Sequence, residues 1–588
     1  MAGLLGIGLS GILGSQAALN TTANNITNAN TPGYSRQDVQ FGAQTPQRTG
    51  AGSIGTGVNV ENIRRLANEY LTQQIREDSS LEGEQRTLNN ELSRLDNLLG
   101  GESTGLSKAL NNFFASLQNA AEDPTSLPQR QLVLSEGQQV VNRFSALNEK
   151  FIQQRESVKT QMQQGAKDAN ALIASIADLN SAISQSPGLA QGRMPNDLLD
   201  QRDEKLRQLS ELVSIKVSPT EGAQVNVTLN NGQGLVIGNI AAELGTRRSA
   251  SDPLMLEFTL GSSGRVANVD SQIDGGKLGG LRHFQQQALT PAFDELGRIA
   301  IALADTVNSQ HQMGMDLEGE LGGLFFKDFN SEALTRNGAA DIAMQVRREE
   351  DLAFASPIRA EGGLGNKGTG VISQGTMLPL RDPIANEPSP DFPGLDELAN
   401  EPLVVEFSKN NEGELRYTVS RKYEKNTDDD DVVVVASTLF EPGQGLFSDN
   451  PSDEDAYQSF QFNVTGQPVA GDSFEIQFNK NGVSDNRNAE FLASFGTKNT
   501  LNNGSQSFAE GYAGLVENVG VQTRQSQLDL EAGKTLLEQS FNQRESVSGV
   551  NLDQEAGKLI QYQAAYNASA KVITVAQDLF NTLLQTFR

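Results

Sequence analysis

Two helical patterns, one at each end of the chain, constrain this fold more than any other feature. Residues 5–28 and 552–587 each carry apolar residues at alternating three- and four-residue spacing, the seam pattern of a coiled coil. Such a seam is stable only when another helix covers it. Two uncovered seams at opposite ends of 588 residues therefore predict that the ends pair with each other, with other copies, or both.

The residues predicted to form this assembly interface are mostly large and apolar. They are Leu5, Leu9, Ile12, Leu19 and Ile26 at the start, and Leu552, Leu559, Tyr566, Ile573, Phe580 and Leu584 at the end. Core helices of an ordinary soluble bundle have the same spacing, so the pattern alone leaves both readings open. Glutamines on both lines, such as Gln16 and Gln563, favour contacts that select register over maximal burial.

Charge is distributed unevenly along the chain, and this also favours assembly through the ends. Residues 1–35 contain no charged side chain, and the charges of residues 551–588 cancel, so the net charge of −27 lies in residues 36–550. Neutral ends can associate without mutual repulsion. The acidic middle argues against a nucleic-acid partner, because phosphate binding needs a basic surface.

Composition excludes several further classes of protein. The chain has no cysteine, so it has no disulfide and no thiolate zinc site. No stretch approaches the roughly 18–20 apolar residues of a membrane span. The apolar run Leu4–Leu13 has no preceding lysine or arginine, unlike a secretory signal. Composition alone therefore favours a cytosolic protein without a membrane span.

The middle of the chain alternates between helical and extended patterns. Helices are predicted at 3–29, 65–99, 106–121, 129–185, 196–213 and 284–313, and from about 505 to 588 with breaks. Short strands with Gly- and Asn-rich turns are predicted in two regions. Those within 214–280 are 214–217, 224–229, 234–237 and 254–260, and those within 335–500 are 403–407, 415–419, 431–437, 460–464 and 473–478. The expected fold class is multidomain α + β, a long α-helical coiled-coil or bundle rod built from both termini, with inserted mainly-β domains.

Four domains are expected from these patterns. Residues 1–34 plus 551–588 form a terminal coiled-coil domain, residues 35–213 plus 281–334 plus 501–550 a helical bundle rod domain, residues 214–280 a small β insert, and residues 335–500 an outer β-rich domain. An insertion of this kind needs only to return near its point of departure.

Signals for catalysis or cofactor binding are weak. His283 and His311 have no partner histidine four residues away, and both are expected to be structural or surface residues. The loop Gly362–Gly370 and the tripeptide Gly533–Thr535 each lack the full order of a phosphate-binding loop. The run Asp428–Asp431 lacks the spaced ligands of a calcium loop. We therefore predict no catalytic, cofactor-binding or metal-binding residue, no cofactor, and no enzyme activity.

The segment Ala23–Tyr34, which reads ANNITNANTPGY, resembles the N-terminal signature of the bacterial flagellar rod, hook and hook-associated family. Its motif turn consists of Asn30, Thr31, Pro32, Gly33 and Tyr34. Residues 548–572 resemble the closing helix of the same family. The segments 35–37, 196–203 and 308–326 narrow the resemblance to hook-associated members, and the whole resemblance covers roughly residues 1–330 and 505–588.

This resemblance implies a structural, non-catalytic subunit that forms a ring at the hook tip and joins hook to filament. Such proteins leave the cell through the flagellar type III export channel without a cleaved signal, which implies a secreted, extracellular location. The implied partners are other copies of the chain, the hook protein, hook-associated protein 3, and an export chaperone on the C-terminal region. The alternatives are another axial protein of the hook type, a secreted adhesin that uses the acidic β domain, or an enzyme carried on residues 335–500.

Overall fold

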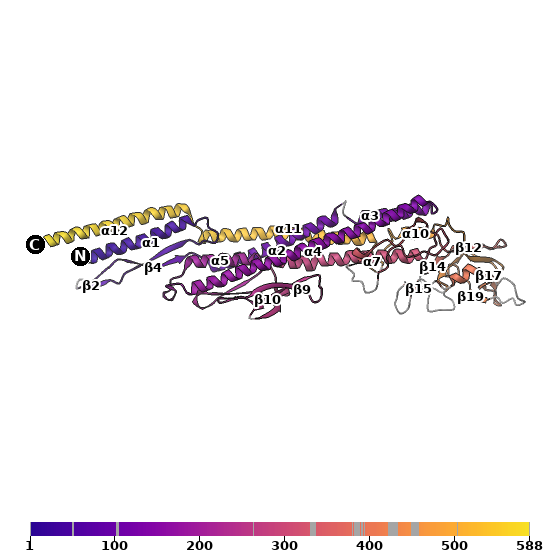
Figure 1. The fold of residues 1–588 in the computed structure, drawn as a ribbon, viewed down its shortest axis with the longest axis horizontal. Coiled ribbons are helices and arrows are strands. Elements are labelled where there is room, and N and C mark those ends of the chain that lie inside the picture. The colour runs from indigo at the N-terminus through magenta and orange to yellow at the C-terminus, as the bar shows by residue number, and fades with distance from the viewer. Residues whose placement is uncertain are drawn as a thin grey trace. The chain divides into compact units, whose positions relative to one another are not determined.

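A computed structural model of the chain (Figure 1) contains two compact units. Unit 1 comprises residues 1–95, 154–289 and 520–588, and unit 2 comprises residues 96–153 and 290–519. The structure describes residues 2–49, 52–101, 105–262, 264–329, 337–378, 380–381, 388–389, 392, 394–421, 433–447, 458–502 and 504–586. The acidic run Asp428–Asp431 and the last seam residue, Phe587, lie outside the described residues. The division into four domains remains a prediction.

Long helices form the framework of both units. They are α1 (Ala2–Thr27), α2 (Glu69–Gly100), α3 (Ser107–Glu122), α4 (Leu127–Ser184), α5 (Asn196–Ser210), α6 (Gly276–His283), α7 (Thr290–Gln312), α11 (Phe508–Ser548) and α12 (Leu552–Thr586). The short helices are α8 (Gly338–Asp341), α9 (Leu395–Asn400) and α10 (Arg487–Ser494). Helices α2, α4 and α11 each contribute residues to both units.

The strands of unit 1 form small antiparallel sheets. Strand β1 (Gln37–Ala43) pairs with β4 (Val58–Arg65), and β2 (Gln47–Thr49) pairs with β3 (Gly52–Ile54). A four-stranded sheet follows with the order β5 (Lys216–Pro219), β6 (Val225–Thr228), β7 (Gly234–Ile237) and β8 (Ile240–Ala241). A three-stranded sheet has the order β11 (Arg265–Asn268), β10 (Leu256–Ser262) and β9 (Glu243–Arg248).

The main sheet of unit 2 has five antiparallel strands. Its order is β12 (Ile358–Gly362), β22 (Ser473–Phe478), β17 (Leu403–Lys409), β18 (Leu415–Arg421) and β19 (Val433–Leu439). Three two-stranded pairs accompany it, β13 (Val371–Ile372) with β21 (Val464–Thr465), β14 (Thr376–Met377) with β20 (Phe460–Gln461), and β15 (Leu380–Arg381) with β16 (Pro388–Ser389). Its core gathers fully buried side chains that include Val405, Val419, Phe460, Phe462 and Ile476.

The helical core of each unit follows the predicted apolar periodicity. In unit 1 the residues Val158, Met162, Ile173, Ile176 and Ile183 of α4 are fully buried, because they recur on one face of the helix. In unit 2 an aromatic cluster forms around the side chains of Phe113, Phe325 and Phe326, whose ring centroids lie 4.8–6.1 Å apart. These elements confirm the predicted multidomain α + β class with long helices and inserted small sheets.

Two predicted elements differ from the structure. The helix expected at 284–313 begins at Gly276 and passes through a π-helical segment, Phe284–Leu289, before α7. Pro291 cannot donate a backbone hydrogen bond, and a π turn just before it accommodates the broken ladder. The strand expected at 460–464 is two short strands, because its halves pair with different partners. No described helix is long and apolar enough to span a membrane.

Candidate assembly site at the paired termini

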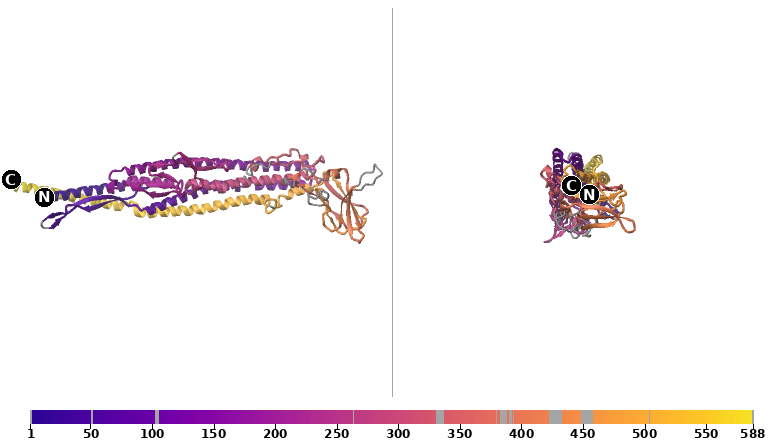
Figure 2. Two further views of the ribbon diagram at one scale, coloured as in Figure 1. Left: turned by 90° about the horizontal axis from the view of Figure 1, so that it is seen from below. Right: turned by 90° about the vertical axis from the view of Figure 1, so that its right-hand side faces the viewer.

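The first and last helices of the chain pair with each other in unit 1. Helices α1 and α12 lie side by side (Figures 1 and 2), and both chain ends lie next to each other. They run antiparallel, since Gly8 meets Ile573 at one end and Asn25 meets Glu555 at the other. Of the two predicted modes of association, the structure shows the ends of one chain pairing with each other.

Small side chains make the contact between α1 and α12. On α1 the line of small residues consists of Gly8 and Gly11, which meet Ser569 of α12, followed by the buried residues Ser15, Ala18, Thr22 and Asn25 at three- or four-residue spacing. A Cβ added at Gly8 would lie 2.6 Å from Ile573 Cγ1, so a larger residue there would push the helices apart. Close approach through small residues leaves Leu4, Leu9 and Leu13 of α1 exposed.

The residues predicted for the assembly interface fall mostly beside this buried line. On α1 all of them except Leu5 lie one residue away from it, and Leu9 is exposed while Leu5, Ile12, Leu19 and Ile26 are half-buried. On α12 the exposed ones are Leu552, Tyr566, Phe580 and Leu584, while Leu559 and Ile573 are half-buried. Both helices therefore keep large apolar side chains in solvent within one chain. Their use as an interface between copies remains a prediction.

A buried carboxylate fixes the register of the two helices. We call the residues Asn25, Tyr34, Arg36 and Glu555 the terminal node. The Glu555 side chain is fully buried, and its carboxylate accepts hydrogen bonds from Arg36 Nε and Asn25 Nδ2, both at 2.9 Å. The Tyr34 hydroxyl donates to Asn25 Oδ1 at 2.8 Å. Because a buried charge is tolerated only when it is paired, the node specifies one alignment of α1, β1 and α12.

The turn after α1 is held by the acidic residues of α5. The backbone N–H of Ser35 donates to Asp200 Oδ2 at 3.0 Å. The guanidinium of Arg65 pairs with Asp200 at 3.0 Å and with Asp203 at 2.8 Å. The side chain of Gln37 donates to Asp197 Oδ1 at 2.8 Å. The segment 196–203 therefore holds Ser35 and Gln37, which directly follow the motif turn, although about 160 residues separate the two segments in sequence.

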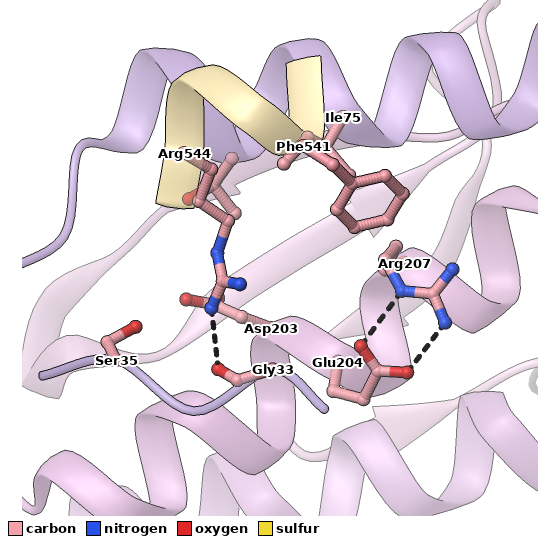
Figure 3. Close-up of a pocket in the computed structure, with 9 residues that line it drawn as sticks. Gly33, Ser35, Ile75, Asp203, Glu204, Arg207, Phe541 and Arg544 are labelled. Atoms are coloured by element: carbon pink, nitrogen blue, oxygen red, sulfur yellow. Dashed lines mark hydrogen bonds and ion pairs between the residues drawn. The ribbon is translucent and has the colours of Figure 1, made fainter. Parts of the chain in front are cut away.

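A small cavity of about 40 Å³ lies between this turn, α2, α5 and α11 (Figure 3). Arg544 Nη2 donates to the carbonyl oxygens of Gly33 and Tyr34 at 2.9 and 3.0 Å. On the other side Arg207 forms two hydrogen bonds with Glu204, at 2.7 and 2.8 Å. Gly33 has φ +82°, and a Cβ there would lie 2.9 Å from Glu204 Cβ, so the turn requires glycine. This cavity has room for water, and a larger cavity of about 370 Å³ shares Gly33, Glu204, Arg207, Phe541 and Arg544 with it.

The electrostatics of this region suit a structural role. Burial raises the pKa of Tyr34 well above its ordinary value, and the nearby carboxylates add to the shift. Burial also raises the pKa of Asp200, although Ser35 and Arg65 oppose this. Burial also disfavours ionised Glu204, but the hydrogen bonds and charge of Arg207, together with Gln208 and Arg544, outweigh it and lower the pKa of that carboxyl. These groups are fixed by mutual hydrogen bonds rather than presented to a substrate.

The other predicted candidates have structural contacts. His311 is fully buried in unit 2, where Nδ1 donates to the Gly323 carbonyl at 2.7 Å and Nε2 accepts from the Ala353 N–H at 2.9 Å. His283 pairs with Glu84 of α2 at 2.6 Å. In the Gly362–Gly370 loop, backbone N–H groups that a phosphate would need donate to the carboxylate of Asp472. Residues 533–535 lie within α11.

Sequence reasoning identified Tyr34 as part of the motif turn but missed the other residues of the terminal node, Asn25, Arg36 and Glu555. Asn25 lies within the family signature, but nothing in its local sequence distinguishes it from the neighbouring asparagines. Glu555 carried one weak signal, since it is among the few charged residues of a neutral, apolar terminal segment. Charged residues at such positions are buried only when paired, and the partner Arg36 is 519 residues away.

Comparisons with known proteins identify the class. Residues 92–326 match the helical domain of flagellar hook-associated protein FlgK, residues 7–34 the flagella basal body rod protein family, and residues 542–586 the C-terminal region of flagellar basal body rod proteins FlgEFG. Together with the paired terminal helices, these matches define a structural protein of the bacterial flagellum. The matched terminal segments are those joined by the terminal node.

Relatives that match almost the whole chain identify the family within this class. The chain is 30% identical to flagellar hook-associated protein 1 of Salmonella typhimurium over 99% of this chain and 100% of that protein, and 28% identical to the Escherichia coli protein of the same name over 99% and 100%. The chain belongs to the flagellar hook-associated protein 1 family. The flagellar hook junction protein FlgK of Burkholderia pseudomallei has the same fold, with a TM-score of 0.67 at 24% identity, covering 81% of this chain and 100% of that one.

Proposed function

We propose that this structural protein of the hook–filament junction acts as a non-catalytic adaptor, as one subunit of a ring at the hook tip. One observation carries the proposal. Helices α1 and α12 bury small residues against each other and leave Leu9, Phe580 and Leu584 exposed. Exposed apolar residues on a helix pair with little charge favour burial against further copies of the same pair.

In this proposal the paired terminal helices supply a core shared with neighbouring axial proteins. The hook protein lies on one side of the ring and hook-associated protein 3 on the other. An export chaperone holds the C-terminal region before the chain leaves the cell, and the assembled ring is extracellular. The helical bundle, the small β insert and the outer β-rich region are separate domains that distinguish this subunit from its neighbours.

A non-catalytic role agrees with the contacts of the polar groups described above. Both histidines hold neighbouring groups in place, and the acidic residues of α5 bind backbone and arginine. Within the described residues, no group of three or more His, Asp and Glu side chains is arranged to hold a metal ion.

Deletion of the gene, followed by electron microscopy, tests the role at the junction. We expect bare hooks and filament protein secreted into the medium without assembly. Normal filaments on the deletion strain would contradict the proposal.

Complementation with matched variants tests the apolar surface of α12. Leu584→Glu places a charge at an exposed apolar position, whereas Gln585→Glu places the same charge on the more polar side of the helix. We expect Leu584→Glu to be secreted but to give few filaments, because burying a charge against a neighbour is costly. Gln585→Glu should restore filaments. Equal filament counts for the two variants would remove Leu584 from the interface.

A further inference from the structure

The part of α11 in unit 1, residues 520–548, fully buries only small residues, half-buries Leu530, Leu537 and Phe541, and leaves Val521 and Leu528 exposed. Ser548 is buried at the end of the helix, and the other buried positions are Ser526, Gly533 and Ser540, at seven-residue spacing. They face α2, since Ser540 donates to Asp78 and a Cβ at Gly533 would lie 3.6 Å from Glu82 Cα. A helix buried only within its own chain normally has the opposite arrangement, with its large apolar residues inside.

The outward face of the same segment carries a second regular line of residues. Its members alternate at four- and three-residue spacing and are Val521, Gln525, Leu528, Ala532, Thr535 and Gln539. All six are exposed, Val521 by 62% and Leu528 by 46%. None of them is ionisable. We call these six residues the outer seam.

The spacing of the outer seam indicates what kind of surface covers it. Alternation of four and three residues keeps a line of side chains facing a partner helix over several turns. A strand or an irregular loop would not match this period. The polar members, Gln525 and Gln539, can select register without adding charge.

Charge indicates that the partner helix comes from another copy of the chain. Two copies with a net charge of −27 each repel through most of their surface, and a neutral line along α11 avoids that repulsion. The seam also lies on the segment that leads directly into α12, because only residues 549–551 separate the two helices. A second copy packed on the exposed residues of α12 is therefore brought next to α11.

We propose that the outer seam of α11 packs against a helix of a neighbouring copy in the assembled ring. This inference rests on the proposed function, and it names a contact surface outside the terminal helix pair. The surface extends subunit contacts from α12 along α11, so that the small residues of α11 face its own chain and the outer seam faces the neighbour.

Photo-cross-linking tests the inference, since the chain contains no native cysteine. Leu528→Cys is labelled with benzophenone maleimide, assembled on hooks in the deletion strain, irradiated and analysed by mass spectrometry. Lys534→Cys is the control, because Lys534 is exposed on another side of the same helix. We expect a dimer-sized adduct from Leu528→Cys that joins two copies of this chain, and little adduct from Lys534→Cys.

Other adducts would overturn the inference. The inference is wrong if Leu528→Cys cross-links to a different protein or only within its own chain. It is also wrong if both positions give equal yields of dimer. Antibody labelling of the unmodified protein on the same particles checks the proposed function separately. If the protein is absent from the hook tip, the proposed function fails, and irradiation of the labelled protein in concentrated solution still tests the seam.

A second variant measures the contribution of the seam without a label. Leu528→Ala removes an exposed side chain, so the monomer should keep its circular dichroism spectrum and its thermal unfolding. Burial of that side chain between copies predicts association weakened roughly tenfold, measured by sedimentation of concentrated protein. Unchanged association of Leu528→Ala would show that a neighbouring copy does not cover the seam.

Discussion

Acidification should weaken unit 2 through His311. Its Nε2 accepts a hydrogen bond from the Ala353 N–H, so that nitrogen carries no proton, and Nδ1–H donates to Gly323. Burial lowers the pKa of the ring to about 4, and Arg130 nearby adds to the shift. Protonation would place a charge in a closed site and break the bond from Ala353.

The direction and size of this loss of stability follow from the pKa of His311 in the folded and the unfolded state. The folded pKa is about 4 and the unfolded pKa about 6.5, so the unfolded state binds more protons between these values. The stabilisation is complete above pH 6.5 and is lost as the pH falls toward 4. At pH 5 the loss amounts to about 2 kcal/mol, or roughly thirtyfold in the opening equilibrium.

Hydrogen exchange at the Ala353 amide measures this loss, once rates are normalised to those of an unstructured peptide. Between pH 7 and pH 5 the opening constant should rise roughly twentyfold. His311→Gln provides the comparison, because it keeps the common carboxylate effects but does not titrate. It should be less protected at pH 7 and less sensitive to pH. Parallel pH profiles for the two proteins would refute the assignment to His311.

Three further predictions concern unit 1. Glu555→Gln should cost about 2–4 kcal/mol by leaving the terminal node unpaired, seen as faster hydrogen exchange in α12, whereas the exposed Asp553→Asn should have little effect. Gly33→Ala should lower stability by about 1–3 kcal/mol in urea unfolding, because φ is +82° at that position; a neutral result would mean that the turn relaxes. His283 should give unit 1 a pH dependence of stability opposite to the one that His311 gives unit 2. Its hydrogen bond to Glu84 raises its pKa, so it stabilises unit 1 below pH 6.5, and this is lost as the pH rises, which exchange of the α6 amides between pH 6 and 8 would detect.

The long helices were predictable because their apolar period is regular over many turns. The helix expected at 129–185 is Leu127–Ser184 in the structure, and the strands expected at 234–237 and 473–478 have those bounds. Local patterns of this kind need no knowledge of the partner. They also indicated that the termini are helices with one face to cover.

The position of the terminal seam could not be predicted in the same way. A search for apolar periodicity selects Leu5, Leu9 and Ile12, whereas α1 approaches α12 through Gly8 and Gly11, each one residue away from that line. Small residues carry little hydrophobic signal, although they allow the closest approach of two helices. The node at Glu555 depends on partners more than 500 residues away, and no local pattern encodes such pairing.

The pairing of α1 with α12 has a consequence for the order of folding. The contact between Asn25 and Glu555 closes a loop of 530 residues, which carries a large entropic cost. During synthesis α1 can pack against β1 and β4, which follow it in the chain, but its contact with α12 cannot form until the last helix is complete. The terminal pair should therefore be the last part of the molecule to form and the first to open. A chain with this folding order can keep its first and last helices unpaired until it assembles.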